Sequence, residues 1–139
     1  MTDYPGKCHC GAISFVYSTR LAPSDWSIRA CQCSFCRAHD ALSTSDPDGF
    51  IRFSTNDAGK LQRYRFGLRT ADFLLCRDCG VYIGAIIKTG NGNRGIVNMH
   101  ALIAAPADIA DVAPIHYDGE DTGKRVARRE DRWTPADQP

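Results

Sequence analysis

The sequence has no excess of either charge and no long apolar run. Its 139 residues include 17 Lys plus Arg and 16 Asp plus Glu, for a formal net charge of +1. This balance gives no electrostatic reason to expect binding to nucleic acid or to an anionic membrane. The longest apolar candidate, Val81 to Ile87, has the length of a strand, whereas a membrane-spanning helix needs about 20 apolar residues. We therefore expect neither nucleic acid nor a membrane as a partner.

A secretory leader, internal repeats and low-complexity segments are also missing. Met1 to Pro5 contains no charged region followed by an apolar stretch, which is the pattern of a signal peptide. A chain of this length is most simply one domain and buries roughly 68–70% of its unfolded surface. We expect one domain over residues 1–117, a polar C-terminal segment over residues 118–139, and a location in the cytoplasm.

Cysteine, in contrast, is abundant, with seven residues. A reducing compartment does not keep structural disulfides, so thiols there more often bind metal or take part in catalysis. The odd number also argues against a fully disulfide-bonded set. Thiolates are soft donors, and zinc in structural sites is commonly held by four of them in a tetrahedron. The composition therefore favours zinc sites built from thiolates.

The cysteines lie in three clusters along the chain. These are Cys8 and Cys10; Cys31, Cys33 and Cys36; and Cys76 and Cys79. In an extended backbone, residues two apart point the same way, so Cys8 and Cys10 can reach one ion. The stretch from Cys76 to Gly80 is typical of a metal knuckle, because glycine permits the positive φ that turns the chain around an ion.

Seven ligands divide naturally into four plus three. Three cysteines lie within residues 31–36 and can wrap a single ion locally. The remaining four would form a second site: Cys8, Cys10, Cys76 and Cys79. A closed set of four thiolates is typical of structural zinc, whereas a set of three leaves open the position that catalytic zinc uses.

Two alternatives to this division stay open. One is a single zinc ribbon, with the ligands Cys33, Cys36, Cys76 and Cys79. The other concerns His39, which follows Cys36 by three residues and could close the three-cysteine site. We expect His9, which lies between two ligands, to point away from the metal, and His100, in an apolar segment, to lie in the core.

Short apolar segments alternate with turn residues along most of the chain. Ile13, Phe15 and Tyr17 lie two apart, and residues 46–49 and 90–93 carry strong turn signals. The predicted strands cover residues 11–18, 27–31, 50–54, 61–66, 72–75, 81–87 and 95–102. A short helix is expected over residues 106–112, and the charged residues 125–132 are expected at the surface. Many short strands with frequent turns favour a mainly β fold.

The order C-x-C-G, then C-x-C-S-x-C-R, then C-x-x-C-G resembles the family of glutathione-dependent formaldehyde-activating enzymes and centromere protein V. The matching stretches are Cys8 to Phe15, Cys31 to Arg37 and Phe73 to Gly80. Weaker matches follow at Leu61, Tyr64, Phe66 and Val97-Asn98. The resemblance covers residues 4–102.

The resemblance implies an Mss4-like fold, which is a β-tent of antiparallel sheets held by zinc. It also implies two zinc ions, one structural and one labile and catalytic. The structural ion would be bound by Cys8, Cys10, Cys76 and Cys79, and the catalytic ion by Cys31, Cys33 and Cys36. The implied reaction adds glutathione to formaldehyde, giving S-hydroxymethylglutathione, and belongs to the carbon–sulfur lyases.

Glutathione carries two carboxylates, so an enzyme of this type needs cationic partners for it. Arg37 adjoins Cys36 and is the best-placed candidate. Three further arginines are more simply explained as surface charges: Arg65, Arg69 and Arg94. The chain departs from the family at residues 38–42 and in its charged end, so the thiol and the aldehyde stay open. A non-catalytic thiol carrier and a zinc-stabilised interaction module are the alternatives to an enzyme.

Overall fold

Strands are the main regular structure in the computed structural model, which describes all residues from 1 to 139. The strands are β1 (Thr2–Lys7), β2 (Ile13–Thr19), β3 (Ile28–Cys31), β4 (Ser43–Thr44), β5 (Phe50–Thr55), β6 (Leu61–Tyr64), β7 (Asp72–Cys76), β8 (Tyr82–Thr89), β9 (Gly92–Asn98), β10 (Val112–Ile115) and β11 (Thr134–Asp137). The helices are α1 (Ser34–Ala38) and α2 (Thr122–Arg132), with 3-10 turns at Pro23–Asp25, Ala58–Lys60 and Met99–Ala101. The mainly β class is confirmed.

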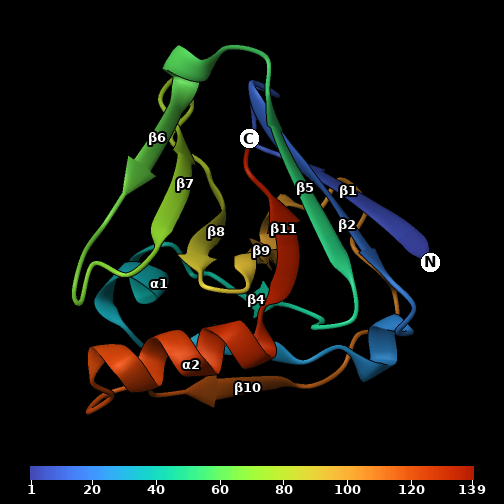
Figure 1. Ribbon diagram of the computed structural model, residues 1–139. Helices are drawn as coiled ribbons and strands as arrows, with labels where there is room; N and C mark the ends of the chain where they lie inside the picture. Colours follow the sequence, from blue (N-terminus) through green and yellow to red (C-terminus); the bar gives the residue numbers. More distant parts are fainter.

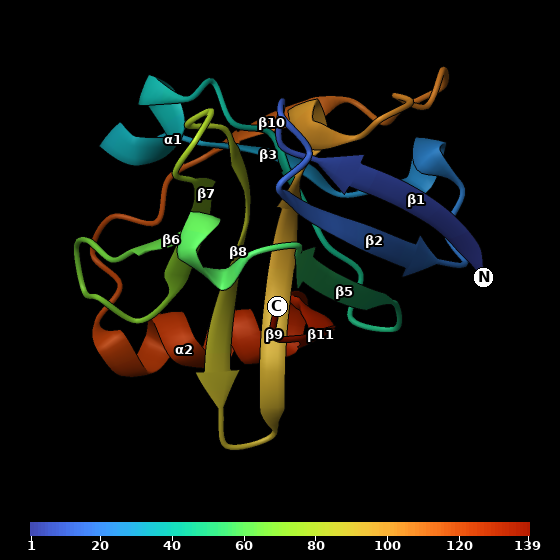
Figure 2. The same cartoon turned by 90° about the horizontal axis from the view of Figure 1, so that it is seen from above.

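The strands assemble into a tent-like arrangement. Their order is β1-β2-β5-β11-β9-β4-β3-β10, and β9 also pairs with β8, which continues through β7 to β6. Figure 1 shows β6 and β7 on one slope and β5, β2 and β1 on the other, with α2 and β10 across the base. Figure 2 shows the long β8–β9 hairpin between the slopes. The pairing is mixed rather than antiparallel throughout, because β10 runs parallel to β3 and β11 parallel to β5.

Two groups of buried side chains hold the slopes together. In β2, Ile13, Phe15 and Tyr17 are buried and their neighbours are less so, as the period of two predicts. They belong to the larger cluster of 18 buried residues, which also contains Cys8 and Cys76. A smaller cluster of 9 contains Cys36. Each large side chain buried in this way stabilises the fold by about 1.5–3 kcal/mol before entropy is counted.

All seven predicted strands are confirmed in position, although the one expected over residues 95–102 ends at Asn98 and continues as a 3-10 turn. The helix expected over residues 106–112 is wrong. The backbone N–H of Ala110 donates to the carbonyl of Pro23, and Val112 begins β10 beside Ile28 of β3. These pairings leave a segment too short to offset the cost of nucleating a helix.

Residues 125–132, expected at the surface, form most of helix α2, and Arg129 is the one buried residue among them. Asp121 caps the helix by accepting a hydrogen bond from the Lys124 backbone N–H at 2.8 Å. Trp133, which ends the helix, is only 4% exposed, and Val126 packs against the same smaller cluster. The chain then continues as β11, between β5 and β9. Two apolar side chains thus attach one side of this charged helix to the core.

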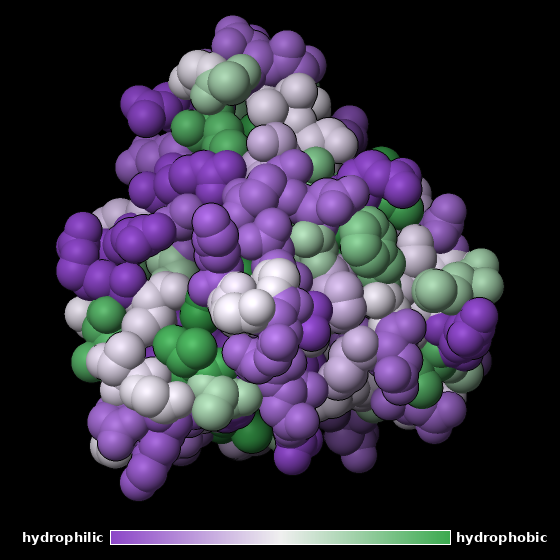
Figure 3. Space-filling view, in the orientation of Figure 1, coloured by the Kyte–Doolittle hydropathy of each residue, from purple (hydrophilic) through white to green (hydrophobic).

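The outer surface is largely polar where Figure 3 displays it. Hydrophilic residues cover most of this face, and hydrophobic residues form small separate patches. No helix of the structure is long and apolar enough to cross a membrane.

Candidate metal centres and the adjoining cavity

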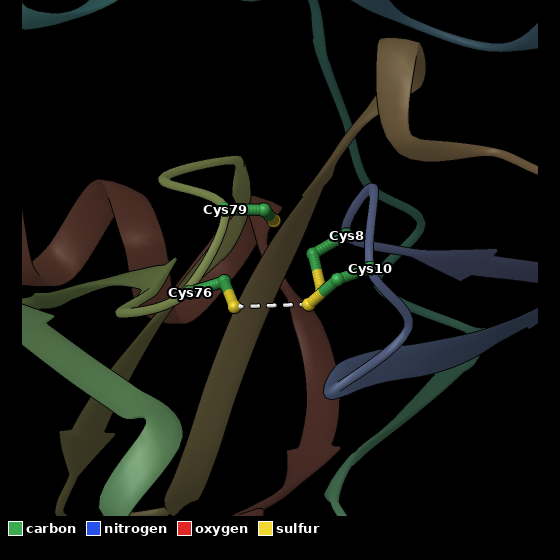
Figure 4. A group of neighbouring side chains, drawn as sticks. All are labelled: Cys8, Cys10, Cys76 and Cys79. Atoms are coloured by element: carbon green, nitrogen blue, oxygen red, sulfur yellow. Dashed lines mark hydrogen bonds between the residues drawn. The ribbon is translucent and has the colours of Figure 1, made fainter.

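Four cysteines meet where the β1–β2 connection approaches the end of β7. Cys8 and Cys10 lie in the connection between β1 and β2, Cys76 ends β7, and Cys79 lies in the turn before β8. Figure 4 shows the two pairs approaching from opposite sides. Gly80 has a φ of 78°, and its N–H donates to the Cys76 carbonyl at 2.9 Å. The predicted knuckle is therefore present.

The spacing of these four sulfurs suits a tetrahedral ion. All four lie within 4.8 Å of one another, with Cys8 to Cys10 at 3.8 Å and Cys10 to Cys76 at 3.6 Å. Tetrahedral zinc with Zn–S bonds near 2.3 Å places its sulfurs about 3.8 Å apart. Desolvation acts to raise the pKa of Cys79, but hydrogen bonds from the backbone N–H groups of Cys10 and Val81 outweigh it and lower this pKa to about 6. A thiolate is therefore already favoured at one of the four cysteines.

The other three cysteines converge within one local segment. Cys31 ends β3, Cys33 is the N-cap of α1, and Cys36 lies inside α1. The Cys36 backbone N–H donates to the Cys33 sulfur at 3.4 Å, which bends the chain so that the three sulfurs lie within 4.8 Å of one another. The expected division into four plus three is therefore seen in the geometry. The single-ribbon alternative does not fit, because its two cysteine pairs lie in separate groups.

Hydrogen bonds among the three thiols favour one thiolate in the group. Contacts from Cys31 and Cys36 lower the pKa of Cys33, to about 2. The same contacts raise the pKa of Cys36 and, through Cys33, that of Cys31. A second or third thiolate here would repel the first at close range. A bound cation would remove this repulsion, so the donor set fits a metal ion.

No histidine or carboxylate joins the three cysteines as a fourth ligand. His39 is exposed, and its ring packs against Phe35 in a tilted arrangement with the centroids 4.5 Å apart. His9 is exposed and lies outside the four-cysteine group. His100 is also exposed, on the 3-10 turn after β9, so its expected place in the core is wrong. The strand predicted to bury it ends two residues earlier.

A small cavity lies against the three sulfurs. Its volume is about 80 Å³, which is room for a molecule of a few heavy atoms, because one water needs roughly 10–15 Å³ on this measure. Its lining combines the three cysteines with aromatic and cationic side chains: Phe66, Phe73, Trp133, Tyr117, Arg29, Arg125, Arg128 and Arg129. A larger cavity of about 380 Å³ shares Arg29, Tyr117, Arg128 and Trp133 with it.

The arginines of this cavity are not the ones that the sequence indicated. Arg37 is exposed and does not line either cavity. Arg65 pairs with Asp72 at 2.5 Å on the outer surface, and Arg94 donates to the Glu130 carbonyl. Three lining arginines instead come from α2: Arg125, Arg128 and Arg129. Their spacing of three and four residues, with Arg132 beyond, places them along one helical side and was a signal available in the sequence.

The fold and the two thiol groups define the class: a mainly β protein whose two cysteine groups could each hold a metal ion. The family model described as glutathione-dependent formaldehyde-activating enzyme matches residues 3–118. The chain therefore belongs to this family. The matched part includes all seven cysteines and ends before α2.

A solved structure supports the same relationship. The crystal structure of a Rhodobacter sphaeroides protein is 31% identical to this chain, with a TM-score of 0.58. The match covers 80% of this chain and 99% of that one. No curated protein matches the chain.

Proposed function

We propose that this protein is a zinc-dependent enzyme that adds glutathione, or a similar thiol, to formaldehyde or another small aldehyde. The observation that carries the proposal is the group of three convergent cysteines, which has no fourth protein ligand and faces a small cavity. Membership of the formaldehyde-activating family supports the same reaction class, that of the carbon–sulfur lyases.

Each cysteine group has its own part in this proposal. Cys31, Cys33 and Cys36 would hold the catalytic zinc, and the four-cysteine group would hold a structural zinc. Zinc in an open site supplies Lewis acidity toward an aldehyde oxygen and lowers the pKa of a thiol. The remaining contribution would come from the cavity, whose aromatic lining from Phe66, Phe73 and Trp133 would limit the access of bulk water to the reacting groups.

The atoms of the reaction balance without any further reactant. The thiol loses its S–H proton, its sulfur forms a bond with the aldehyde carbon, and the carbonyl π bond opens. The proton ends on the former carbonyl oxygen, which gives a hydroxymethyl thioether. Holding both reactants within one small cavity converts a bimolecular step into a local one, and such positioning can lower barriers by several kcal/mol.

Exchange spectroscopy by NMR can test the proposal with formaldehyde and glutathione at equilibrium. We expect the metal-loaded protein to speed the exchange between free glutathione and its hydroxymethyl adduct, and Cys36→Ser to return it to the spontaneous rate. Zinc analysis of the same samples shows whether the four-cysteine ion is retained in the variant. If the protein binds two ions and glutathione but leaves the exchange rate unchanged, the thiol-carrier alternative replaces the enzyme.

A further inference from the structure

The small cavity is unusually rich in positive charge. Four guanidiniums line it, one from Arg29 of β3 and three from α2. Glu120 is the carboxylate that pairs with two of them, at 3.2 Å from Arg125 Nε and 2.8 Å from Arg128 Nε. Arg29 and Arg129 form no ion pair with any carboxylate of the chain.

Arg129 is held in place by neutral groups. The residue is 8% exposed, its Nη1 donates to Thr70 Oγ1 at 2.7 Å, and its guanidinium lies 4.7 Å from the centre of the Trp133 ring. Its buried Nε has no hydrogen-bond partner. Burial lowers the pKa of Arg129 to about 10, so the side chain stays charged at neutral pH. A buried charge with an unused donor is costly unless an anion completes its surroundings.

Arg29, which is half-buried, also has neutral hydrogen-bond partners. Its Nη2 donates to Ser45 Oγ at 2.9 Å and its Nη1 to Ser27 Oγ at 3.2 Å, both neutral acceptors. It lines the small cavity and also the larger one beside it. Arg29 can therefore meet an anion in either space.

Once a metal is bound, the thiolates of the three cysteines do not neutralise the positive charge of the cavity. Four guanidiniums face one carboxylate and three thiolates, and a divalent ion adds two further positive charges. The loaded cavity therefore keeps an excess of positive charge. Formaldehyde and other neutral aldehydes would leave that excess without a counter-charge.

We propose that Arg29 and Arg129 form a carboxylate-binding subsite beside the three-cysteine site, so that this protein prefers a reactant that carries a carboxylate. The subsite depends on α2, which lies beyond the residues that the family model matches. A guanidinium binds a carboxylate through two parallel hydrogen bonds, which gives both affinity and orientation. The catalytic consequence rests on the proposed function, whereas the binding does not.

The two cavities admit two sources for the carboxylate. A two- or three-carbon oxo acid fits the volume of about 80 Å³ beside the sulfurs. A thiol such as glutathione would place its carboxylate toward the larger cavity of about 380 Å³, where Arg29 is joined by Arg128 and Arg132. Both sources share the same recognition chemistry.

The binding test is calorimetric titration of the metal-loaded protein with glycolate, and with ethylene glycol as its neutral counterpart. We expect glycolate to bind and ethylene glycol not to. Arg129→Gln should weaken glycolate binding about ten-fold or more, since a hydrogen bond to a charged group contributes roughly 1.5–3 kcal/mol. Lys124→Gln is the matched control, because it removes a charge from an exposed position of the same helix and should change nothing.

Equal affinity for glycolate in the Arg129→Gln and Lys124→Gln proteins overturns the proposal. Equal binding of glycolate and ethylene glycol by the wild-type protein would overturn it too. This second comparison can be made even if Arg129→Gln fails to fold. Arg129→Lys keeps the charge but not the planar pair of donors, and we expect it to retain part of the affinity.

Turnover then distinguishes the sources of the carboxylate. If the aldehyde carries it, wild type prefers glyoxylate to glycolaldehyde and Arg129→Gln loses that preference. If the thiol carries it, Arg29→Gln loses the preference for glutathione over 2-mercaptoethanol, because Arg29 also lines the larger cavity and Arg129 does not. Glycolate binding through Arg129 without any turnover would refute the proposed enzyme and keep the subsite. Turnover of formaldehyde without glycolate binding would refute the subsite and keep the proposed enzyme.

Discussion

The two cysteine groups use the same ligand atom in opposite structural settings. Cys10 and Cys76 are 66 residues apart in sequence, and their contact joins the β1–β2 connection to the end of β7. Cys31, Cys33 and Cys36 all belong to one short segment around α1. Cys8 and Cys76 lie in the larger buried cluster, whereas Cys36 lies in the smaller one that faces the cavity.

From this difference we infer that the separation of the cysteines along the chain, more than their chemistry, sets how much a bound ion would stabilise the fold. An ion that joins distant segments closes a long loop and adds its binding free energy to folding. An ion bound within a local turn closes almost no loop. Such an ion adds little to the stability of the fold, so it can be released or change its ligands without unfolding the protein. The same contrast orders the expected effects of the following substitutions.

The largest effect is expected for Cys76→Ser. The change removes one thiol of the four-cysteine group that joins the two slopes, and in small domains structural zinc contributes about 10–16 kcal/mol of apparent binding free energy. That exceeds the whole stability of most domains. We expect insoluble protein, or protein without a cooperative thermal transition by circular dichroism.

Cys33→Ser provides the matched comparison, since it removes one ligand from the local group. We expect soluble protein with a cooperative transition near that of the wild type. Equal loss of stability in the two variants would show that the functional division of the two groups is wrong.

The sequence was sufficient to predict these groups but not the cavity beside them. Knuckles and closely spaced cysteines are local patterns, so Cys76 to Gly80 and Cys31 to Cys36 could be assigned from spacing alone. The cavity wall depends on where Val126 and Trp133 dock, which is a tertiary contact. For that reason the sequence predicts Arg129 at the surface, and it favours Arg37, which adjoins Cys36 in sequence but has an exposed side chain.

The next effect in size is expected for Trp133→Ala. Trp133 is 4% exposed, packs in the smaller cluster and lines both cavities. Replacing a buried aromatic residue by alanine costs about 3–5 kcal/mol. We expect denaturant unfolding to show a loss of this size with the four-cysteine ion still bound. Loss of that ion in the folded variant would mean that the two clusters are not independent.

Removal of metal by a chelator should have a smaller effect on stability and occur in two steps. The three-cysteine group lacks a fourth protein ligand, so we expect its ion to leave first. A colorimetric zinc indicator should record a fast and a slow release. The thermal midpoint should fall by about 4 °C or less after the first step, a change near 1 kcal/mol, and collapse after the second. Release of all metal in a single step, together with loss of folding, would contradict the proposed difference between the four-cysteine and the three-cysteine group.

The smallest effect is expected for Glu120→Gln, which tests the wall of the cavity. The hydrogen bond from Arg128 is the main cause of a lowered pKa at Glu120, and Arg125 adds to it. A carboxyl group with a lowered pKa stabilises the folded state above its unfolded pKa, and this contribution is lost as the pH falls through the folded pKa. The substitution should therefore cost about 1 kcal/mol near neutral pH, because the pair is partly buried, and almost nothing in acid. Chemical denaturation at several pH values measures the difference.

Asp131→Asn is the control, since the Asp131–Arg132 pair is exposed on both sides and should contribute nothing at any pH. Equal losses in the two variants would mean that Glu120 does not hold Arg125 and Arg128 against the cavity.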